Sequence, residues 1–147
     1  MHEKGWRIGP VITRSIRTAR AARRRIGAGK PQAGWSEAAL GADLILISTP
    51  DRAIAEKIAR TLVEQKLAAC VNILAGCMSI YRWDGMVETA AEVPLLIKTR
   101  AEIYPEVEAA IKGLHPYELP EIVAMPIAQG SREYLEWINA ATVTEIG

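Results

Sequence analysis

The fold is decided by residues 68–100, which read AACVNILAGCMSIYRWDGMVETAAEVPLLIKTR. Two runs rich in Val, Ile, Met and Thr flank the dipeptide Asp84-Gly85. Asp-Gly between two such runs is among the strongest short signals for a β-hairpin, because both residues tolerate a positive φ. The stretch therefore predicts two long antiparallel strands, 68–83 and 86–100. Gly76 is expected to mark a bulge that bends the first of them.

The segments on either side predict the remaining elements. Residues 44–49, LILIST, predict a short buried strand, and the i, i+4 spacing of Ile54, Ile58 and Leu62 predicts an amphipathic helix over 51–67. Ser48 or Thr49 is expected to cap that helix. A helix over 101–114, a strand over 121–128 and a helix over 131–143, capped by Ser131, follow the hairpin. The order predicts an α+β fold, a ferredoxin-like β-α-β-β-α-β sandwich with an extra C-terminal helix, an antiparallel sheet and a long hairpin between its second and third strands.

This topology places the four strands in the order 4-1-3-2. Pro126 then lies in an edge strand, where a missing N–H does least damage to the ladder. Pro94 indicates that the third strand bends or changes partners along its length. The second strand forms the other edge, and it is long and apolar. Because such an edge invites pairing with another chain, we expect the hairpin to mediate self-association.

Charge divides the 147 residues into two parts. Residues 1–43 carry nine Lys/Arg against three acids, a net +6, whereas residues 44–147 carry nine against fourteen, a net −5. We interpret 1–43 as a basic leader without a stable fold and 44–147 as the folded domain, with an organelle-targeting peptide or a nucleic-acid patch as alternatives for the leader. The apolar runs are far shorter than the roughly 20 residues of a membrane helix. Two cysteines and no secretory pattern favour a cytoplasmic protein without a membrane partner.

Polar residues on the two hairpin strands are candidates for a site. Cys70 and Asn72 share one face of their strand, whereas Cys77 faces the opposite way unless Gly76 shifts the register. Glu92 stands between apolar neighbours, so a buried carboxylate there would need a cation, a metal ion or several donors. The alternatives are a solvated hairpin face or an ion pair with Lys98 of another subunit.

His115 follows a predicted helix and precedes Pro116, and two roles are open to it. It can bond the last free carbonyls of the helix, or its imidazole can bind a divalent ion. The sequence lacks the C-x-x-C, H-E-x-x-H, Walker and G-x-S-x-G motifs, so metallohydrolase, NTPase and esterase functions lack support and we expect no enzymatic activity. Phenylalanine is absent and the folded part is acidic, so we expect no nucleic-acid partner.

Five motifs in order resemble the CutA family of divalent-cation tolerance proteins. The motifs read KLAACVNIL (66–74), SIYRWDGMVE (79–88), EVPLLIKTR (92–100), HPYELPEIV (115–123) and YLEWI (134–138), and the resemblance as a whole runs from about Leu44 to Val143. The resemblance implies a tight homotrimer with interleaved hairpins and a link to tolerance of copper and other divalent ions. The leader has no counterpart in the family pattern.

The resemblance also implies a cleft between subunits. Its metal ligands would be His115, Cys70 and Glu92, and its other binding residues would be Asn72, Trp83, Lys98 and Tyr117. The chain departs from the copper ligands reported in a bacterial member. Ile47-Ser48 stand where that member has a cysteine, and Leu114-His115 stand where it has two histidines.

The leading hypothesis is therefore a homotrimeric metal-response protein that binds copper or another divalent ion weakly at an intersubunit cleft. The alternative is a trimeric signalling module, similar in architecture to PII regulators, in which His115, Lys98 and Tyr117 contact a small anion. An acylphosphatase-like hydrolase would need an Arg-bearing loop after the first strand, and Pro50-Asp51 is unsuited to that role.

Overall fold

The computed structural model describes residues 41–142. The predicted leader, 1–43, lies outside the described residues except for its last three positions. The first strand, β1 (Ala42–Thr49), begins two residues before the expected border at 44, so the folded part includes Ala42 and Asp43.

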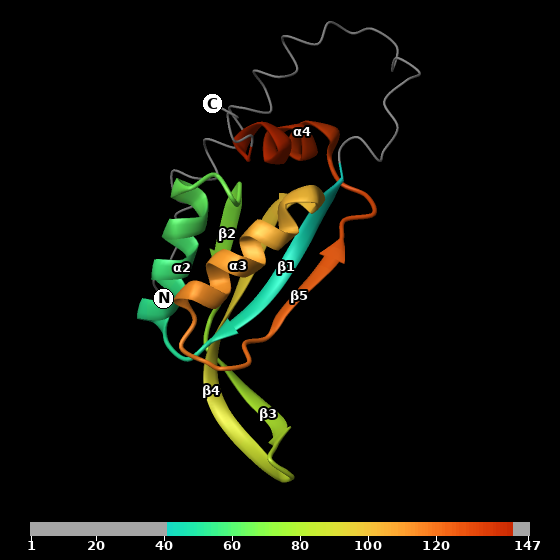
Figure 1. Cartoon of the computed structure of the whole chain (residues 1–147). Helices are drawn as coiled ribbons and strands as arrows, with labels where there is room; N and C mark the ends of the chain where they lie inside the picture. The colour runs from blue at the N-terminus through green and yellow to red at the C-terminus, as the bar shows by residue number, and fades with distance from the viewer. Residues whose placement is uncertain (1–40, 143–147) are drawn as a thin grey trace, which may run out of the picture. The chain divides into compact units, whose positions relative to one another are not determined.

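The sheet has the predicted order. β1 lies between β4 (Met86–Arg100) and β5 (Ile122–Pro126), and β2 (Cys70–Ile73) flanks β4 on its other side. All pairs are antiparallel, and β3 (Cys77–Trp83) pairs with the far half of β4 (Figure 1). Pro126 lies on the edge strand β5, as expected. The ferredoxin-like order 4-1-3-2 is confirmed.

The predicted strand 68–83 is divided into two strands, and the stretch between them is one residue longer than the facing stretch of β4. Ile73 is paired with Leu95, and Cys77 is paired with Glu92. The chain thus takes four steps on this strand for three steps on β4, with Leu74 N–H donating to the carbonyl of Pro94 (2.9 Å) in between. This is the expected bulge, and β4 exchanges β2 for β3 close to Pro94, as its sequence predicts.

The helices begin and end close to the predicted positions, with one correction. They are α2 (Arg52–Glu64), α3 (Tyr104–Leu114), which follows a 3-10 turn at Ala101–Ile103, and α4 (Arg132–Ala141). The N-cap of α2 is Asp51, whose carboxylate accepts from Ile54 N–H (2.8 Å), so the prediction of Ser48 or Thr49 was wrong. Thr49 donates instead to the carbonyl of Val93 (2.8 Å), across the sheet. Ser131 caps α4, as predicted.

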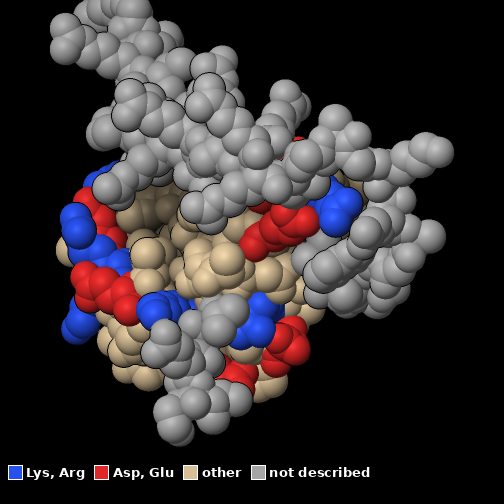
Figure 2. Space-filling view, turned by 90° about the horizontal axis from the view of Figure 1, so that it is seen from above, with Lys and Arg blue, Asp and Glu red and all other residues tan. Residues whose placement is uncertain are grey.

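Helix α4 packs at one end of the sheet. Ile138 is buried beside Ala42 and Ala69, and the guanidinium of Arg100 donates to the hydroxyl (3.0 Å) and carbonyl (2.7 Å) oxygens of Thr142. Seen from this end, the described residues show blue and red side chains interspersed around an area of tan residues (Figure 2). The visible part of this face therefore carries no block of one charge sign.

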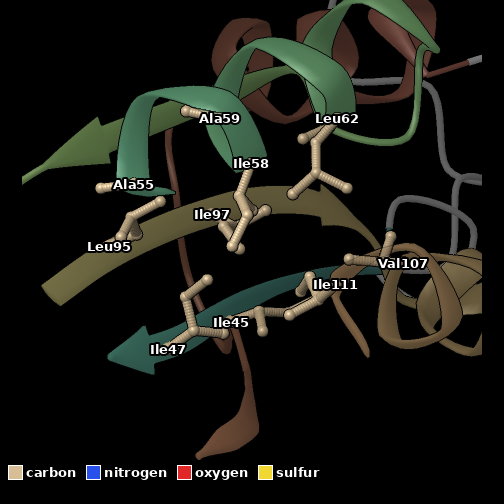
Figure 3. Packing of buried hydrophobic residues seen from close by; sticks show 11 residues of the cluster. Ile45, Ile47, Ala55, Ile58, Ala59, Leu62, Leu95, Ile97, Val107 and Ile111 are labelled. Carbon is tan, nitrogen blue, oxygen red and sulfur yellow. The ribbon is translucent and has the colours of Figure 1, made fainter. Parts of the chain in front are cut away.

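The main core lies between the sheet and helices α2 and α3. Ile58 of α2 points toward Ile97 of β4, and Ile111 of α3 lies next to Ile45 of β1 (Figure 3). The four side chains are fully buried. Burial of a side chain of this size stabilises a fold by about 1.5–3 kcal/mol. Alternate residues of β1 and β4 supply the core, so their other residues face away from these two helices.

That second face of the sheet, and both faces of the β3–β4 hairpin, carry apolar side chains in contact with solvent. Leu46 and Leu96 are half-buried there, and Val123 and Met125 of β5 are exposed on the same side. On the hairpin, Met78 is 73% exposed; the other exposed large apolar residues of the hairpin are Ile80, Tyr81, Trp83, Met86 and Val87. We call the second face of the sheet, together with the exposed apolar side chains of the hairpin, the open face.

Within residues 41–142, every helix is too short or too polar to cross a membrane.

Candidate functional site

A groove of about 750 Å³ lies on the open face where the hairpin leaves the sheet. One wall is β3, the other is the segment 116–121, and Glu92 of β4 lies between them. Its lining is more apolar than polar, and its charged groups are three carboxylates. The lining residues are Ser79, Ile80, Tyr81, Trp83, Glu92, Pro116, Tyr117, Glu118, Leu119 and Glu121.

The extra residue before β3 determines which hairpin side chains enter the groove. Because Cys77 pairs with Glu92, the residues Ser79, Tyr81 and Trp83 share the face of Glu92. Without the extra residue these side chains would lie on the opposite face. Cys77 therefore lies on the same face as Cys70 and not on the opposite one. The sequence prediction allowed for this outcome if the register shifted near Gly76, and the extra residue provides that shift.

Glu92 and Tyr117 form the polar centre of the groove. Glu92 is only 9% exposed, although it carries a carboxylate. Burial raises the pKa of Tyr117, and the nearby Glu92 charge, the Tyr81 hydroxyl and a hydrogen bond to Glu92 raise it further. The Tyr117 hydroxyl therefore keeps its proton and donates it toward the Glu92 carboxylate.

His115 is buried behind the groove, and both of its ring nitrogens are engaged. Nε2 lies 2.6 Å from the carbonyl oxygen of Ser48, and Nδ1 accepts from Tyr117 N–H at 3.1 Å. These partners require the tautomer with the proton on Nε2, which donates to Ser48. The backbone N–H of His115 closes α3 by donating to Ile111 (2.8 Å). The ring does not bond the last carbonyls of α3, so that part of the capping prediction was wrong.

A second polar cluster lies farther along the open face, beside α4. The ammonium of Lys98 is 3.8 Å from the Cys70 sulfur, and these two residues are register partners on β4 and β2. Burial raises the pKa of Tyr134, and the neighbouring Cys70 raises it further by charge and by a hydrogen bond. Asn72 is exposed on the same strand as Cys70. We call Cys70, Asn72 and Lys98 the β2 cluster.

The structure thus divides the predicted site residues. Trp83, Glu92 and Tyr117 meet in the groove; Cys70, Asn72 and Lys98 lie in the β2 cluster; His115 supports the groove from behind. Sequence reasoning missed Glu118 and Glu121, which line the groove, and Ser48, whose hydroxyl donates to Glu121 (3.1 Å). The acidic residues around the Pro116–Pro120 pair were the available signal.

Metal binding by residues 41–142 of one chain alone does not fit this arrangement. Among residues 41–142, no three His, Cys, Asp or Glu side chains lie close enough together to hold an ion. Cys70 and Glu92 belong to different clusters, and His115 would have to release one of its two hydrogen bonds to become a ligand. A complete ligand set therefore requires donors from outside residues 41–142 of one chain.

Comparison with known proteins identifies the family pattern over nearly all of the described part. A family model described as "CutA1 divalent ion tolerance protein" matches residues 43–141. The divalent-cation tolerance protein CutA of Thermus thermophilus is 50% identical over 100 residues, which cover 68% of this chain and 97% of the relative. The chloroplastic Protein CutA of Arabidopsis thaliana is 39% identical over 99 residues, and the match spans 67% of this chain but only 54% of that relative.

Solved structures agree with the sequence matches. The cation tolerance protein (Cut A1) of Thermus thermophilus has a TM-score of 0.68 at 49% identity, covering 69% of this chain and 99% of that chain. The structure of the periplasmic divalent cation tolerance protein CutA from Archaeoglobus fulgidus gives the same TM-score at 41% identity, with coverage of 69% and 99%.

Proposed function

Because the chain belongs to the CutA1 divalent ion tolerance family, we propose that it acts in divalent-cation tolerance as a homotrimer. In this proposal a divalent ion, with Cu²⁺ as the first candidate, binds weakly in the groove beside Glu92, at a cleft between copies. The observation that carries the proposal is the Glu92 carboxylate, which is 9% exposed and has no cationic partner in the described part of the chain.

Association of copies is supported by the open face. Monomeric proteins rarely expose a contiguous apolar patch of this kind without a functional reason. The outer edge of β3 also lacks a strand partner in the described sheet, so its backbone N–H and C=O groups are available to another chain. A trimer would cover both features, and the interleaving of hairpins that the family resemblance implies involves the same residues.

Cation binding is supported by the charge of the groove. Glu92, Glu118 and Glu121 line it, and none of its lining residues is Lys, Arg or His. Carboxylate oxygens suit hard divalent ions, and for a given set of ligands Cu²⁺ binds most tightly among the first-row divalent ions. Since residues 41–142 of one chain lack a full ligand set, we infer weak binding with ligands shared between copies. Cys70 and His115 stay candidate ligands in this proposal.

The alternative of a PII-like module for a small anion takes second place. The groove would have to receive an anion beside three carboxylates, whereas Lys98 lies outside its lining. A non-enzymatic role and a cytoplasmic location complete the proposal. The names of two relatives place those proteins in chloroplast and periplasm, so location is to be tested by cell fractionation.

Isothermal titration calorimetry with Cu²⁺ tests the metal proposal. Glu92→Gln keeps the shape and the Tyr117 contact but removes the charge, and we expect a loss of affinity of about tenfold, about 1.4 kcal/mol. Glu64→Gln, an exposed Glu at the end of α2, is the matched control and should leave the isotherm unchanged. Equal isotherms for wild type and Glu92→Gln would exclude the groove. Thermal-shift measurements with small anions test the alternative, which predicts a raised melting temperature.

A further inference from the structure

Glu92 and Lys98, on the open face of β4, are the two charged side chains of that face that are buried or half-buried and lack an ion-pair partner among residues 41–142. Residues 41–142 contain three ion pairs, and neither Glu92 nor Lys98 belongs to any of them. Glu92 is nine-tenths buried, with the Tyr117 hydroxyl as its polar neighbour. A buried carboxylate in proteins is usually paired with a cation or coordinates a metal. The position of Glu92 therefore calls for a cation that residues 41–142 of the same chain do not supply.

Lys98 differs from the other basic residues of the described part. Lys98 and Arg100 are its only half-buried basic residues, and all the others are exposed. Arg100 is paired with Glu102. The ammonium of Lys98 instead lies 3.8 Å from the Cys70 sulfur, and no carboxylate of residues 41–142 pairs with it. A half-buried ammonium without a carboxylate is the counterpart of the buried carboxylate without an ammonium.

Glu92 and Lys98 cannot pair within one chain. They share a face of β4, but they are six residues apart on an extended strand. At about 3.3 Å per residue the separation is about 20 Å, whereas a salt bridge needs nitrogen and oxygen within about 4 Å. Only a second molecule can bring these two charges together.

We propose that Lys98 of one copy forms an ion pair with Glu92 of the neighbouring copy in the assembled protein. In a closed ring of copies each interface is head-to-tail, so each copy gives its Lys98 on one side and receives a Lys98 at its Glu92 on the other. Every copy then satisfies both charges. This inference rests on the proposed function, because it needs the homotrimer, and it adds the residues that the partner contributes.

The pair would also unite the two halves of the site. Lys98 carries the β2 cluster with it, so Cys70 and Asn72 of one copy come to the groove that holds Trp83 and Tyr117 of the next. The thiol and the carboxylate, which are separate in a single chain, then border one cleft. A divalent ion that binds Glu92 has to compete with the Lys98 ammonium, so occupancy of the cleft by the ion is coupled to this contact between copies.

Charge exchange tests the pair. The dissociation constant of the assembly is measured by analytical ultracentrifugation for Glu92→Lys, Lys98→Glu and the double variant, with circular dichroism as the check of folding. Each single variant should weaken assembly by at least about tenfold, and the double variant should recover most of the loss. Sites that are more than 7–10 Å apart in one chain are otherwise additive, so recovery reports a contact between copies. Glu88→Lys combined with Lys98→Glu is the matched control. It should show no recovery, because Glu88 lies on the same face as Glu92 but four residues nearer the hairpin tip.

Neutral variants cover the case in which Lys at position 92 does not fold. Glu92→Gln, Lys98→Met and their combination should weaken assembly to the same extent, since each removes the same pair. Additive losses in both series would overturn the inference, and so would a wild type that is monomeric at micromolar concentration. If the wild type assembles and binds Cu²⁺ but the double variant does not recover, the ion pair is excluded and the proposed function is not affected. Recovery without Cu²⁺ binding leaves the pair standing and removes the metal from the proposed function.

Discussion

His115 connects three segments that are distant in sequence. Its ring donates to the carbonyl of Ser48 at the end of β1 and accepts from the amide of Tyr117, and its backbone closes α3. It thereby fixes the segment that forms one wall of the groove. In this geometry the imidazole acts as a positioning group, with both nitrogens satisfied by the backbone.

Replacing His115 with Ala should reduce stability. The change leaves the Ser48 carbonyl and the Tyr117 N–H without their partner in a buried place, so we expect the free energy of unfolding to fall by about 2–3 kcal/mol. Urea unfolding at one fixed protein concentration measures it, because assembly also contributes. His115→Gln, whose amide can still donate to Ser48, should lose less. A His115→Ala protein within about 0.5 kcal/mol of wild type would contradict the positioning role.

Tyr117 gives the protein a dependence on alkaline pH. Burial and Glu92 raise the pKa of Tyr117 in the folded state above the ordinary value of about 10. Between those two values the folded state keeps a proton that the unfolded state has lost, so the free energy of unfolding falls as pH rises through this window. Its contribution is fully present below about pH 10. Urea unfolding midpoints across this range should fall less steeply for Tyr117→Phe, and an equal slope would show that the phenol does not titrate with folding.

Residue identity revealed part of the site in advance. Glu92 stood out because its neighbours are apolar, and the structure buries it, which is the condition under which a partner was expected. The partners of His115 were out of reach, because Ser48 is 67 residues away and its carbonyl is a backbone atom with no signature in the sequence. Long-range contacts to the main chain leave no pattern that composition or spacing can report.

At the scale of single elements, helix α2 depends on Asp51. Its carboxylate satisfies the Ile54 N–H at the start of the helix. Asp51→Ala should destabilise the protein by about 1 kcal/mol, measured by urea unfolding. Asp51→Asn keeps the acceptor oxygen and should stay close to wild type. A loss as large for Asn as for Ala would mean that the hydrogen bond is not the source of the effect.

The elements themselves were predictable, and their ends less so. Periodicity placed three helices and the strands of the sheet, because amphipathic spacing reports the buried face directly. The cap of α2 was misplaced because Ser48, Thr49 and Asp51 are all good capping residues, and the competing bond from Thr49 to Val93 is a tertiary contact. Local sequence cannot rank caps when one of them has another partner.

For the whole molecule, the strand order followed from the predicted β-α-β-β-α-β order of elements, and the proline in the edge strand agreed with it. What lay beyond the sequence was the division of the site residues between two clusters on one chain. That division depends on the distance between Glu92 and Lys98, which an extended strand holds apart within one copy.

Assembly should respond to a charge on the outer side of the hairpin. Met78 is 73% exposed and pairs with Ala91, on the face opposite to Glu92. Met78→Lys should leave the circular dichroism unchanged and raise the dissociation constant of the assembly by about tenfold, about 1.4 kcal/mol, because a buried contact surface would have to hold an ammonium. Analytical ultracentrifugation measures it. Val63→Lys, at an exposed apolar position of α2, is the control, and an equal effect there would point to general charge repulsion.

The surplus residue between Ile73 and Cys77 has a consequence for engineering. Side chains alternate along a strand, so the number of residues in the stretch 74–76 determines which face each side chain of β3 lies on. Removing or adding one residue there would turn Tyr81 and Trp83 away from the face of Glu92 and bring Met78 onto it, whereas a change of two residues would keep the present alternation. Loop grafts and length variants at this junction should therefore be designed in even steps.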